Sequence, residues 1–290
     1  MMTSDRGALL AACALSGVAL GFVCARYVVP ACCTAKSRTK VQRGKVYLIG
    51  AGPGAPDLLT VRARNYLQAA TVAVMDDLVA KELYELLPPD CEIVYVGKRG
   101  GKKDSAKQTD IDDVLVKKAR ANHVVVRVKG GDPMVFGRVH SEIRALVKAK
   151  CAFEVVPGIS SALAAPAIVD IPITHKHLSK SFLVISGHKP AEMDFNVLAQ
   201  IDTISMLMGT RTLETVCTRL MEAGREPKTP VALIHNATLP EQETLLGSLE
   251  DIAEKASAKS YSPAIVVIGE VAKYADFDTY VKEPAEDNVV

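Results

Sequence analysis

The sequence predicts an α/β protein with mostly parallel sheets, and three observations support this. Short apolar runs alternate with helical stretches from residue 45 onward. The first run, Val46-Tyr47-Leu48-Ile49, has the β-branched and aromatic composition of a strand that is covered on both faces. Three of the runs lead into glycine turns, which begin at Gly50, Gly130 and Gly158. Strands that end in such turns are typical of open α/β sheets, in which ligands bind beyond the carboxyl ends of the strands.

We expect nine strands in two sets, separated by helical stretches. They lie near residues 45–50, 71–76, 92–97, 123–129 and 153–156, and then near 181–187, 203–208, 230–235 and 263–269. No repeat or low-complexity linker separates the two sets, so their boundary falls loosely between residues 157 and 178. We therefore expect an N-terminal α/β domain at residues 44–160, a C-terminal α/β domain at 161–283 and a frayed acidic tail at 284–290.

The composition excludes several classes of protein. A chain of 290 residues is long enough for one large domain or two ordinary ones. Its net charge of +2 gives no bulk field that would attract nucleic acid. The seven cysteines show no C-x-x-C spacing, so neither a disulfide framework nor a zinc site is expected. We expect Cys91, Cys151 and Cys217 to be buried thiols.

Residues 8–25 form an uncharged apolar run that is just long enough to cross a membrane. We expect residues 1–43 to be an anchor or targeting segment with a basic linker, and the catalytic part to be soluble. The anchor is favoured, but Val23-Cys24-Ala25 resembles the cleavage site of a signal or transit sequence, so both interpretations stay open. In an anchor, the basic residues after position 25 favour a cytosolic or matrix-like side for the folded part. Cys32 and Cys33 would then be candidate acylation sites.

The first glycine turn contains Gly50, Gly52 and Gly54, and the Pro56-Asp57 pair after it predicts the start of a helix. A tight turn and a dinucleotide-binding loop are both compatible with this pattern, because Gly50, Gly52 and Ala55 fit G-x-G-x-x-A. The two prolines disfavour the dinucleotide loop, since each removes a backbone N–H that would bind a pyrophosphate. A ligand with an adenosine but no phosphates does not need these N–H groups, so the prolines would weaken its binding less.

The second and third turns add polar side chains. Asp132 follows Gly130-Gly131 and either binds a ligand hydroxyl or amine or stabilises the turn. Ser160, in the sequence Pro157-Gly158-Ile159-Ser160, either caps the next helix or binds a ligand. Three glycine turns that face one side of a sheet indicate a binding site.

The stretch Lys98–Lys107, KRGGKKDSAK, carries five basic residues and one acidic residue. It is either a solvated loop or a cationic rim for a polyanionic small molecule. Arg138 and the His175-Lys176-His177 cluster would extend this rim. No histidine has a metal-ligand partner at helical spacing, so we expect no metal site.

Several motifs together resemble a known family. They are VYLIGAGPGAPDLLT, VAVMDDLV, VYVGKRGGK, VVRVKGGDPMVFGR, FEVVPGISSALAAPA, IPITH, MLMGT, TPVALIHNAT and SPAIVVIGEV. In this order, over roughly residues 45–271, they resemble the uroporphyrinogen III C-methyltransferases of the tetrapyrrole methylase superfamily, including the methyltransferase part of sirohaem synthase. The resemblance implies two α/β domains with the active site in the cleft between them, and a homodimer. It also implies S-adenosylmethionine as methyl donor and the conversion of uroporphyrinogen III to precorrin-2, on the way to sirohaem or cobalamin.

The resemblance also implies roles for individual residues. Asp76 matches the proposed proton acceptor, Lys98 matches the proposed donor, and Arg138 is a third catalytic candidate. From their charge and not from the resemblance, Lys102 and Lys103 of the basic stretch and Lys176 are candidates for substrate binding. The S-adenosylmethionine pocket is expected to contain Pro53, Gly130, Gly131, Asp132, Val135, Ser160, Ser161, Met208 and Ala237.

The chain departs from the family pattern at three places, all on the tetrapyrrole side of the expected site. It has Met75-Asp76-Asp77 in place of Tyr-Asp-Arg, residues 138–142 read Arg-Val-His-Ser-Glu in place of Arg-Gly-Gly-Glu-Glu, and Thr174-His175-Lys176 replaces Thr-His-Arg. Fewer arginines weaken the recognition of carboxylates, because lysine does not form bidentate pairs.

Other functions remain open on the sequence alone. One is a methyltransferase of the same superfamily with another acceptor, either a later corrinoid precursor or a protein, as in diphthine synthase. The KRGGKK run favours a polyanionic macrocycle over a protein. Another is a membrane-tethered binding protein that has lost turnover. A dinucleotide oxidoreductase comes last, because nothing in the second half supplies a site for a hydride acceptor.

Overall fold

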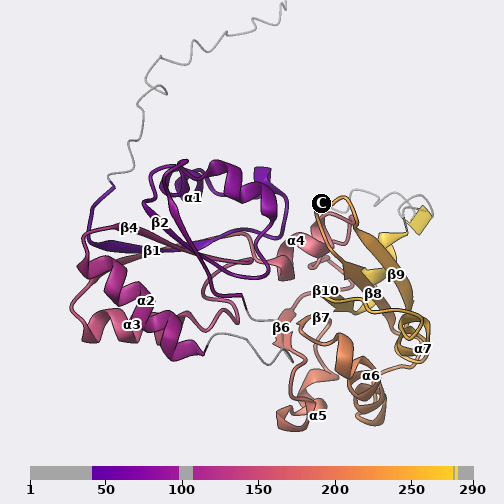
Figure 1. The fold of residues 1–290 in the computed structure, drawn as a ribbon. Helices are drawn as coiled ribbons and strands as arrows, with labels where there is room; N and C mark the ends of the chain where they lie inside the picture. The colour runs from indigo at the N-terminus through magenta and orange to yellow at the C-terminus, as the bar shows by residue number, and fades with distance from the viewer. Residues whose placement is uncertain (1–40, 98–106, 277, 280–290) are drawn as a thin grey trace, which may run out of the picture. The chain divides into compact units, whose positions relative to one another are not determined.

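A computed structural model describes residues 41–97, 107–276, 278 and 279 of the chain (Figure 1). The apolar run at residues 8–25, the candidates Lys98, Lys102 and Lys103, and the acidic tail lie outside the described residues. Among the described residues, no helix is long and apolar enough to cross a membrane. The interpretation of residues 1–43 and the domain division at residue 160 stay predictions.

The first sheet has five strands, all of which pair in parallel, as expected. Their order in space is β3-β2-β4-β1-β5, so β1 lies beside β4 and β5 although it comes first in the chain. The strands are β1 (Lys45–Gly50), β2 (Val72–Met75), β3 (Glu92–Tyr95), β4 (Val124–Lys129) and β5 (Ala152–Val156).

Helices cover both faces of the first sheet (Figure 1). The helix α1 (Val61–Leu67) packs on the face that contains Tyr47 and Ile49. The helices α2 (Gln108–Arg120) and α3 (Val139–Lys148) pack on the face that contains Val46 and Leu48. Because side chains alternate between the two faces of a strand, a strand that is apolar at every position must be buried on both sides. This explains the continuous apolar run of β1.

The second sheet is mixed, so the expectation of a mostly parallel sheet is wrong for this half of the chain. Its order is β6-β7-β10-β8-β9, and only the β6–β7 pair is parallel. The other three pairs are antiparallel. The strands are β6 (Phe182–Ser186), β7 (Thr203–Leu207), β8 (Pro230–His235), β9 (Glu243–Ser248) and β10 (Ala264–Ile268). Antiparallel strands need no crossover helix, which is why β8 and β9 follow one another directly.

Helices also cover both faces of the second sheet. One face carries α5 (Phe195–Leu198), α6 (Leu213–Glu222) and α7 (Ile252–Ala256). The other carries α4 (Ser161–Ala167) and the 3-10 helix η6 (Glu270–Ala275). The remaining 3-10 helices are η2 (Pro56–Leu58), η3 (Lys81–Leu86), η4 (Pro190–Glu192) and η5 (Thr210–Thr212).

The structure corrects three local predictions. Pro56 begins the short helix η2, whereas α1 starts only at Val61, where the Thr60 hydroxyl caps it by accepting from Ala63 N at 3.2 Å. The strand β9 was not predicted. Cys217 is buried as expected, and burial raises the pKa of its thiol to about 12. The prediction of burial was wrong for Cys91 and Cys151, which are partly exposed.

Candidate active site at the strand ends

The carboxyl ends of β2, β4, β1 and β5 are neighbours along one edge of the first sheet, because these strands are adjacent and parallel. Asp76 follows β2, the turn at Gly130 follows β4, the turn at Gly50 follows β1, and the turn at Gly158 follows β5. The sheet order therefore confirms that the three glycine turns lie together. It also adds Asp76 to the same edge.

The three turns pack at backbone distance. Gly52 N donates to Gly131 O at 3.2 Å, and Gly131 N donates to Gly52 O at 2.7 Å. A Cβ atom added at Gly50 would lie 2.6 Å from both Gly131 O and the Cα of Gly158, closer than real side chains approach. Glycine is required at Gly50 for this steric reason. The turns thus form one compact unit.

Asp132 joins the second turn to the third. Its Oδ2 accepts from Gly158 N at 3.0 Å, and its Oδ1 accepts from Met134 N at 2.8 Å. The structure therefore supports a stabilising role for this carboxylate. Each oxygen keeps a second lone pair, so direct ligand contact stays a prediction.

Ser160 is 8% exposed, and its hydroxyl caps α4 by accepting from Ala162 N at 3.3 Å. The same first turn of α4 is also held by Ser205 of β7, whose hydroxyl donates to Ala162 O at 2.9 Å. The helix that starts at Ser161 is thus held between the third glycine turn and the second sheet.

The turns after β7 and β8 belong to the same region. Both strands run antiparallel to β10, so their carboxyl ends lie at the same edge of the second sheet. Met208 follows β7 and is 51% exposed, whereas Ala237, after β8, is buried. Ala55 N donates to Thr238 Oγ1 at 3.0 Å, which connects the first glycine turn, with Pro53, to the turn of Ala237.

Backbone strain distinguishes these turns from ordinary helix ends. Asn122, Lys150 and Asp170 have positive φ after α2, α3 and α4, where a left-handed residue is common. The other non-glycine residues with positive φ in the described part of the chain follow strands β4, β7 and β8. Strain of this kind is concentrated at functional sites. These residues are Phe136, Arg138, Met208, Asn236 and Thr238.

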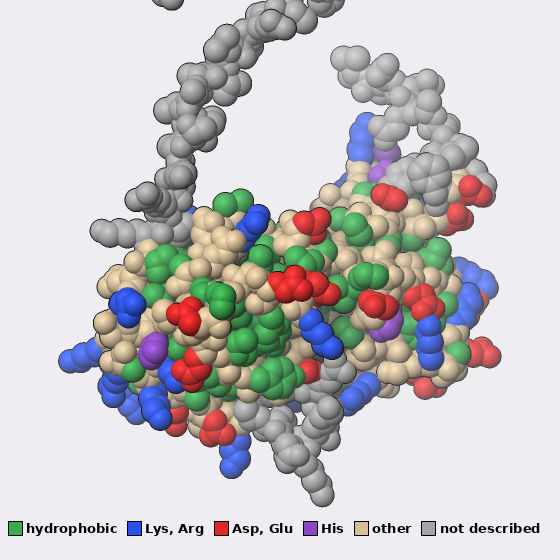
Figure 2. Space-filling model, turned by 45° about the horizontal axis from the view of Figure 1, so that its top comes forward, with side chains coloured by type: hydrophobic (Ala, Val, Ile, Leu, Met, Phe, Trp, Pro, Cys, Tyr) green, Lys and Arg blue, Asp and Glu red, His purple; other side chains and the backbone are tan. Residues whose placement is uncertain are grey.

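Large apolar side chains are exposed at the same strand ends. Apolar side chains that face water are suited to binding the apolar surface of a ligand or partner. On one face of the molecule, hydrophobic side chains gather between charged ones (Figure 2). The exposed apolar residues of the strand-end turns and of the start of α4 are Leu78, Met134, Phe136, Ile159, Leu163 and Met208.

Asp76 is held at both carboxylate oxygens. Its Oδ1 accepts from Asp77 N at 2.9 Å, and its Oδ2 accepts from Arg127 Nη2 at 3.0 Å. Its side chain is still 26% exposed. Asp77 accepts a short hydrogen bond from the Tyr95 hydroxyl. The candidate proton acceptor is therefore fixed in position and remains accessible.

The other described candidates lie at a helix end or in loops. Arg138 is exposed and forms the N-cap of α3. Lys176 is exposed in a loop that His175 stabilises, because His175 Nδ1 accepts from His177 N and Leu178 N at 3.3 Å each. No group of three or more metal-ligating side chains occurs within the described parts of the chain. Val135 lies in the turn after β4, between exposed Met134 and Phe136.

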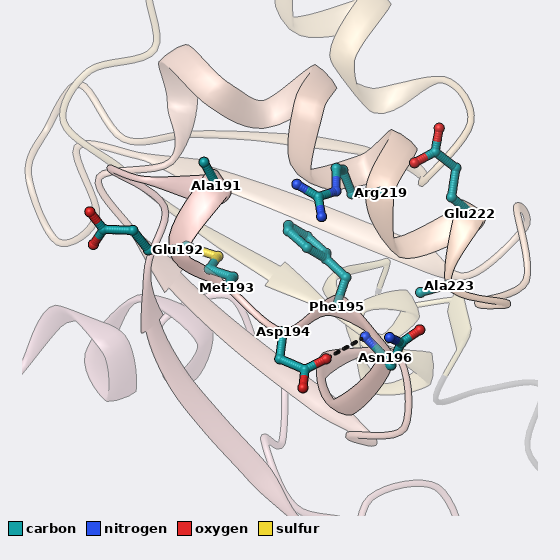
Figure 3. Close-up of a pocket in the computed structure, with 9 residues that line it drawn as sticks. All are labelled: Ala191, Glu192, Met193, Asp194, Phe195, Asn196, Arg219, Glu222 and Ala223. Carbon is teal, nitrogen blue, oxygen red and sulfur yellow. Dashed lines mark hydrogen bonds between the residues drawn. The ribbon is translucent and has the colours of Figure 1, made fainter.

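A cavity of about 500 Å³ lies elsewhere, beside α5 and α6 (Figure 3). The guanidinium of Arg219 lies over the Phe195 ring at 4.6 Å, and Asp194 caps α5 by accepting from Asn196 N at 3.1 Å. None of the predicted site residues that the structure describes lines this cavity, so the strand ends, where the strained turns are, stay the candidate active site.

Sequence reasoning missed Arg127 and Glu142. Arg127 of β4 is 2% exposed, and its Nε donates to Glu142 Oε1 at 3.0 Å. Lys129 Nζ donates to the same oxygen at 3.1 Å. Burial lowers the pKa of Lys129, as does nearby Arg127, while Glu142 opposes the shift. The signal was present in VVVRVK, since two charges inside a buried strand require partners.

Comparisons with known proteins agree with the family resemblance of the sequence. A family model described as Tetrapyrrole (Corrin/Porphyrin) Methylases matches residues 45–253. The uroporphyrinogen-III C-methyltransferase of Synechococcus elongatus is 44% identical over 230 residues, which cover 79% of this chain and 94% of that protein. The enzyme of the same name from Methanocaldococcus jannaschii is 44% identical over 240 residues, covering 80% and 98%. The crystal structure of the Thermus thermophilus uroporphyrin-III C-methyl transferase complexed with S-adenyl homocysteine superposes with a TM-score of 0.69 at 37% identity, covering 79% and 99%.

Proposed function

We propose that this chain, which belongs to the tetrapyrrole (corrin/porphyrin) methylase family, transfers methyl groups from S-adenosylmethionine to ring carbons of uroporphyrinogen III. The product would be precorrin-2, an intermediate toward sirohaem. The observation that carries the proposal is the unit of three glycine turns, in which Asp132 joins the second turn to the third, at the same strand ends as Asp76. Two relatives named uroporphyrinogen-III C-methyltransferase match this chain over nearly their whole length.

The strand-end residues fit S-adenosylmethionine. Glycines at Gly130 and Gly131 keep side chains off the edge of the sheet, where a nucleoside needs room. Exposed Met134, Ile159 and Met208 offer apolar surface to an adenine ring. With the remaining predicted residues, Pro53, Asp132, Val135, Ser160, Ser161 and Ala237, they would form the binding site. When bound, the cofactor supplies a methyl group on a positively charged sulfur.

The protein's own contribution is alignment and proton removal. A nucleophilic ring carbon must approach the methyl group in line with the S–C bond that breaks. The turns therefore act chiefly by orienting the two ligands toward each other and excluding water. As the new C–C bond forms and the S–C bond breaks, the macrocycle gains a positive charge and must lose a proton. We assign this proton to the carboxylate of Asp76. Lys98 and Arg138 remain candidates for proton donation and for the stabilisation of charge.

Uroporphyrinogen carries many carboxylates, so its side of the site should be cationic. We propose that Lys102, Lys103 and Lys176 bind these carboxylates. Two residues that depart from the family pattern make hydrogen bonds within the protein. Asp77 accepts from the Tyr95 hydroxyl, and the Ser141 hydroxyl donates to Asp112 Oδ2 at 2.6 Å. The carboxylate of Asp77 would repel the carboxylates of the substrate, and its hydrogen bond from Tyr95 reduces this repulsion. Uroporphyrinogen III therefore stays our first choice of acceptor.

The same departures favour a second candidate, a relative that uses the same cofactor with another methyl acceptor or with lost turnover. A homodimer, membrane attachment through residues 8–25 and an active site between domains at 44–160 and 161–283 are further parts of the proposal. The family resemblance supports the homodimer and the placement of the site. The apolar composition of residues 8–25 supports the attachment.

The test is single-turnover methyl transfer with the full chain, labelled S-adenosylmethionine and uroporphyrinogen III. We expect label in a dimethylated product with the mass and absorbance of precorrin-2. Cofactor binding without transfer to any tetrapyrrole would support the binding protein, and transfer to a later precursor alone would support the other acceptor. Failure to bind the cofactor would refute all three.

A further inference from the structure

Four charged side chains form a cluster that reaches from α3 to the end of β2. Arg127 is 2% exposed and Glu142 is fully buried. Arg127 donates through Nε to Glu142 Oε1 and through Nη2 to Asp76 Oδ2, both at 3.0 Å. Lys129 Nζ also donates to Glu142 Oε1, at 3.1 Å. Fully ionised, the cluster of Asp76, Arg127, Lys129 and Glu142 has no net charge.

Stability alone does not explain this cluster. Burying ions has a large desolvation penalty, so apolar residues of similar volume often give an equally stable core. The neighbouring positions Val125, Val126 and Val128 show that this strand accepts such residues. Glu142 Oε2, moreover, is buried without a hydrogen-bond partner among the described residues. An arrangement that leaves a carboxylate oxygen unsatisfied is retained for a reason other than stability.

The geometry of Arg127 indicates that reason. Its Nη1 donates to Val128 O at 3.1 Å and to Val74 O at 3.4 Å, so every nitrogen of the guanidinium has a partner. The planar group is therefore fixed in orientation and presents Nη2 to Asp76. Asp76, held on its other side by Asp77 N, cannot turn away although its side chain is 26% exposed.

We propose that Arg127 is a positioning residue that fixes the Asp76 carboxylate for proton transfer, and that Glu142 fixes Arg127 through its Nε. This inference deepens the proposed function and rests on Asp76 as the proton acceptor. Lysine at position 127 keeps the charge but loses the planar fork. Arg127→Lys therefore separates orientation from charge.

The first experiment measures whether Arg127 holds Asp76, independently of any reaction. The Asp77 amide donates to Asp76 Oδ1, so its hydrogen exchange reports on the carboxylate. In the full chain, we expect Arg127→Lys to accelerate exchange at Asp77 by about fivefold or more, toward the rate in Asp76→Ala. Unchanged exchange in folded Arg127→Lys would overturn the proposal.

Two further variants make this result specific. Arg225 is a half-buried arginine that donates to Ile201 O at 2.7 Å and to Asp202 O at 3.0 Å, so Arg225→Lys should leave the Asp77 amide unchanged. If Arg127→Lys fails to fold, Glu142→Gln replaces it, because this change keeps the volume and weakens the hold on Arg127. The same acceleration is then expected, and its absence would refute the proposal.

The second experiment is a double-mutant cycle on single-turnover methyl transfer. Arg127→Lys should slow transfer by about tenfold or more while the Kd for S-adenosylmethionine stays within about twofold. In the Asp76→Asn background it should have no further effect, since there is no carboxylate to position. An equal loss of transfer rate in the wild-type and Asp76→Asn backgrounds would mean that Arg127 only stabilises the fold and does not position Asp76. A wild-type rate in Asp76→Asn would refute the proton-acceptor role, while the amide exchange still shows whether Arg127 fixes Asp76.

Discussion

The carboxylate of Asp132 accepts from the backbone N–H of Gly158 at 3.0 Å, across two turns that are 26 residues apart in the chain. The contact fixes the end of β4 against the end of β5, although β1 lies between these strands in the sheet. A single side chain thus sets the spacing of the turns that we propose bind the cofactor.

We predict that Asp132→Ala weakens S-adenosylmethionine binding by about tenfold or more, roughly 1.4 kcal/mol. The variant loses the acceptor for Gly158 N and for Met134 N, so both turns are released. Titration calorimetry measures the affinity, and the control is Asp57→Ala, which changes an exposed aspartate of η2. Normal affinity in a folded Asp132→Ala would show that the cofactor does not depend on this contact.

Gly158→Ala tests the packing of the turns sterically. The new Cβ would lie 2.3 Å from Gly131 O and 2.7 Å from the Cα of Gly50. We expect a loss of about 1–3 kcal/mol in the free energy of unfolding, together with weaker cofactor binding. Gly224→Ala is the matched control, since its Cβ meets nothing within 4 Å and only its φ of +94° opposes the change. It should lower stability without changing cofactor affinity, as followed by urea unfolding and calorimetry.

The first sheet was predictable because its strands are short, mostly apolar runs, three of which, β1, β4 and β5, lead into glycine turns. The same periodicity cannot give strand direction, which is why the antiparallel pairs of β10 were missed. β9 contains Glu243, Gly247 and two threonine or serine positions, and lies at a sheet edge where half-exposed residues weaken the apolar signal. The glycine turns of the site could be recognised in the sequence. The contact of Asp76 with Arg127 could not, because it depends on β2 and β4 being neighbours in the sheet, which only the structure shows.

Glu154 should make stability depend on pH on the acid side. Burial alone would raise its pKa, but hydrogen bonds from Lys45 and Tyr66 outweigh this and lower the pKa from 4.5. A lowered carboxylate pKa means that the stabilisation is present above about pH 4.5 and is lost as the pH falls through the folded-state value. We expect Glu154→Gln to cost about 1 kcal/mol or less near neutral pH, since the pair is partly exposed, and less still in acid.

Urea unfolding of wild type and Glu154→Gln at several pH values measures this difference. Glu192→Gln is the control, because the Lys189–Glu192 pair is 64% and 68% exposed and should contribute almost nothing at any pH. A gap between wild type and Glu154→Gln that stays constant down to about pH 3 would show that the side chain acts by packing and not by charge.

Deletion of residues 1–40 should leave a folded protein that binds the cofactor. The described contacts of the core start at Val41, which packs beside the first sheet, and at Gln42, whose N–H donates to Tyr47 OH at 2.8 Å. Both residues are retained in the truncated chain. Circular dichroism and calorimetry should match the full chain, and loss of binding on truncation would make the N-terminal segment part of the site.

The basic stretch Lys98–Lys107 provides the test of the substrate. We predict that replacing Lys102, Lys103 and Lys107 with glutamine raises the KM for uroporphyrinogen III by several-fold and leaves cofactor affinity unchanged, because these charges would attract carboxylates. The wild-type KM should also rise with salt, which screens exposed charges beyond about 10 Å at 0.1 M.

Lys98 should behave differently within the same stretch. If it donates a proton, Lys98→Gln should lower kcat more than it raises KM, as expected for an interaction made mainly in the transition state. Steady-state kinetics over a range of salt concentrations distinguish the two kinds of variant, with Lys148→Gln on the exposed side of α3 as a charge-matched control. A triple variant with normal KM and no dependence on salt would show that this stretch does not contact the substrate. The choice of acceptor would then move from a polycarboxylate macrocycle to another class of methyl acceptor.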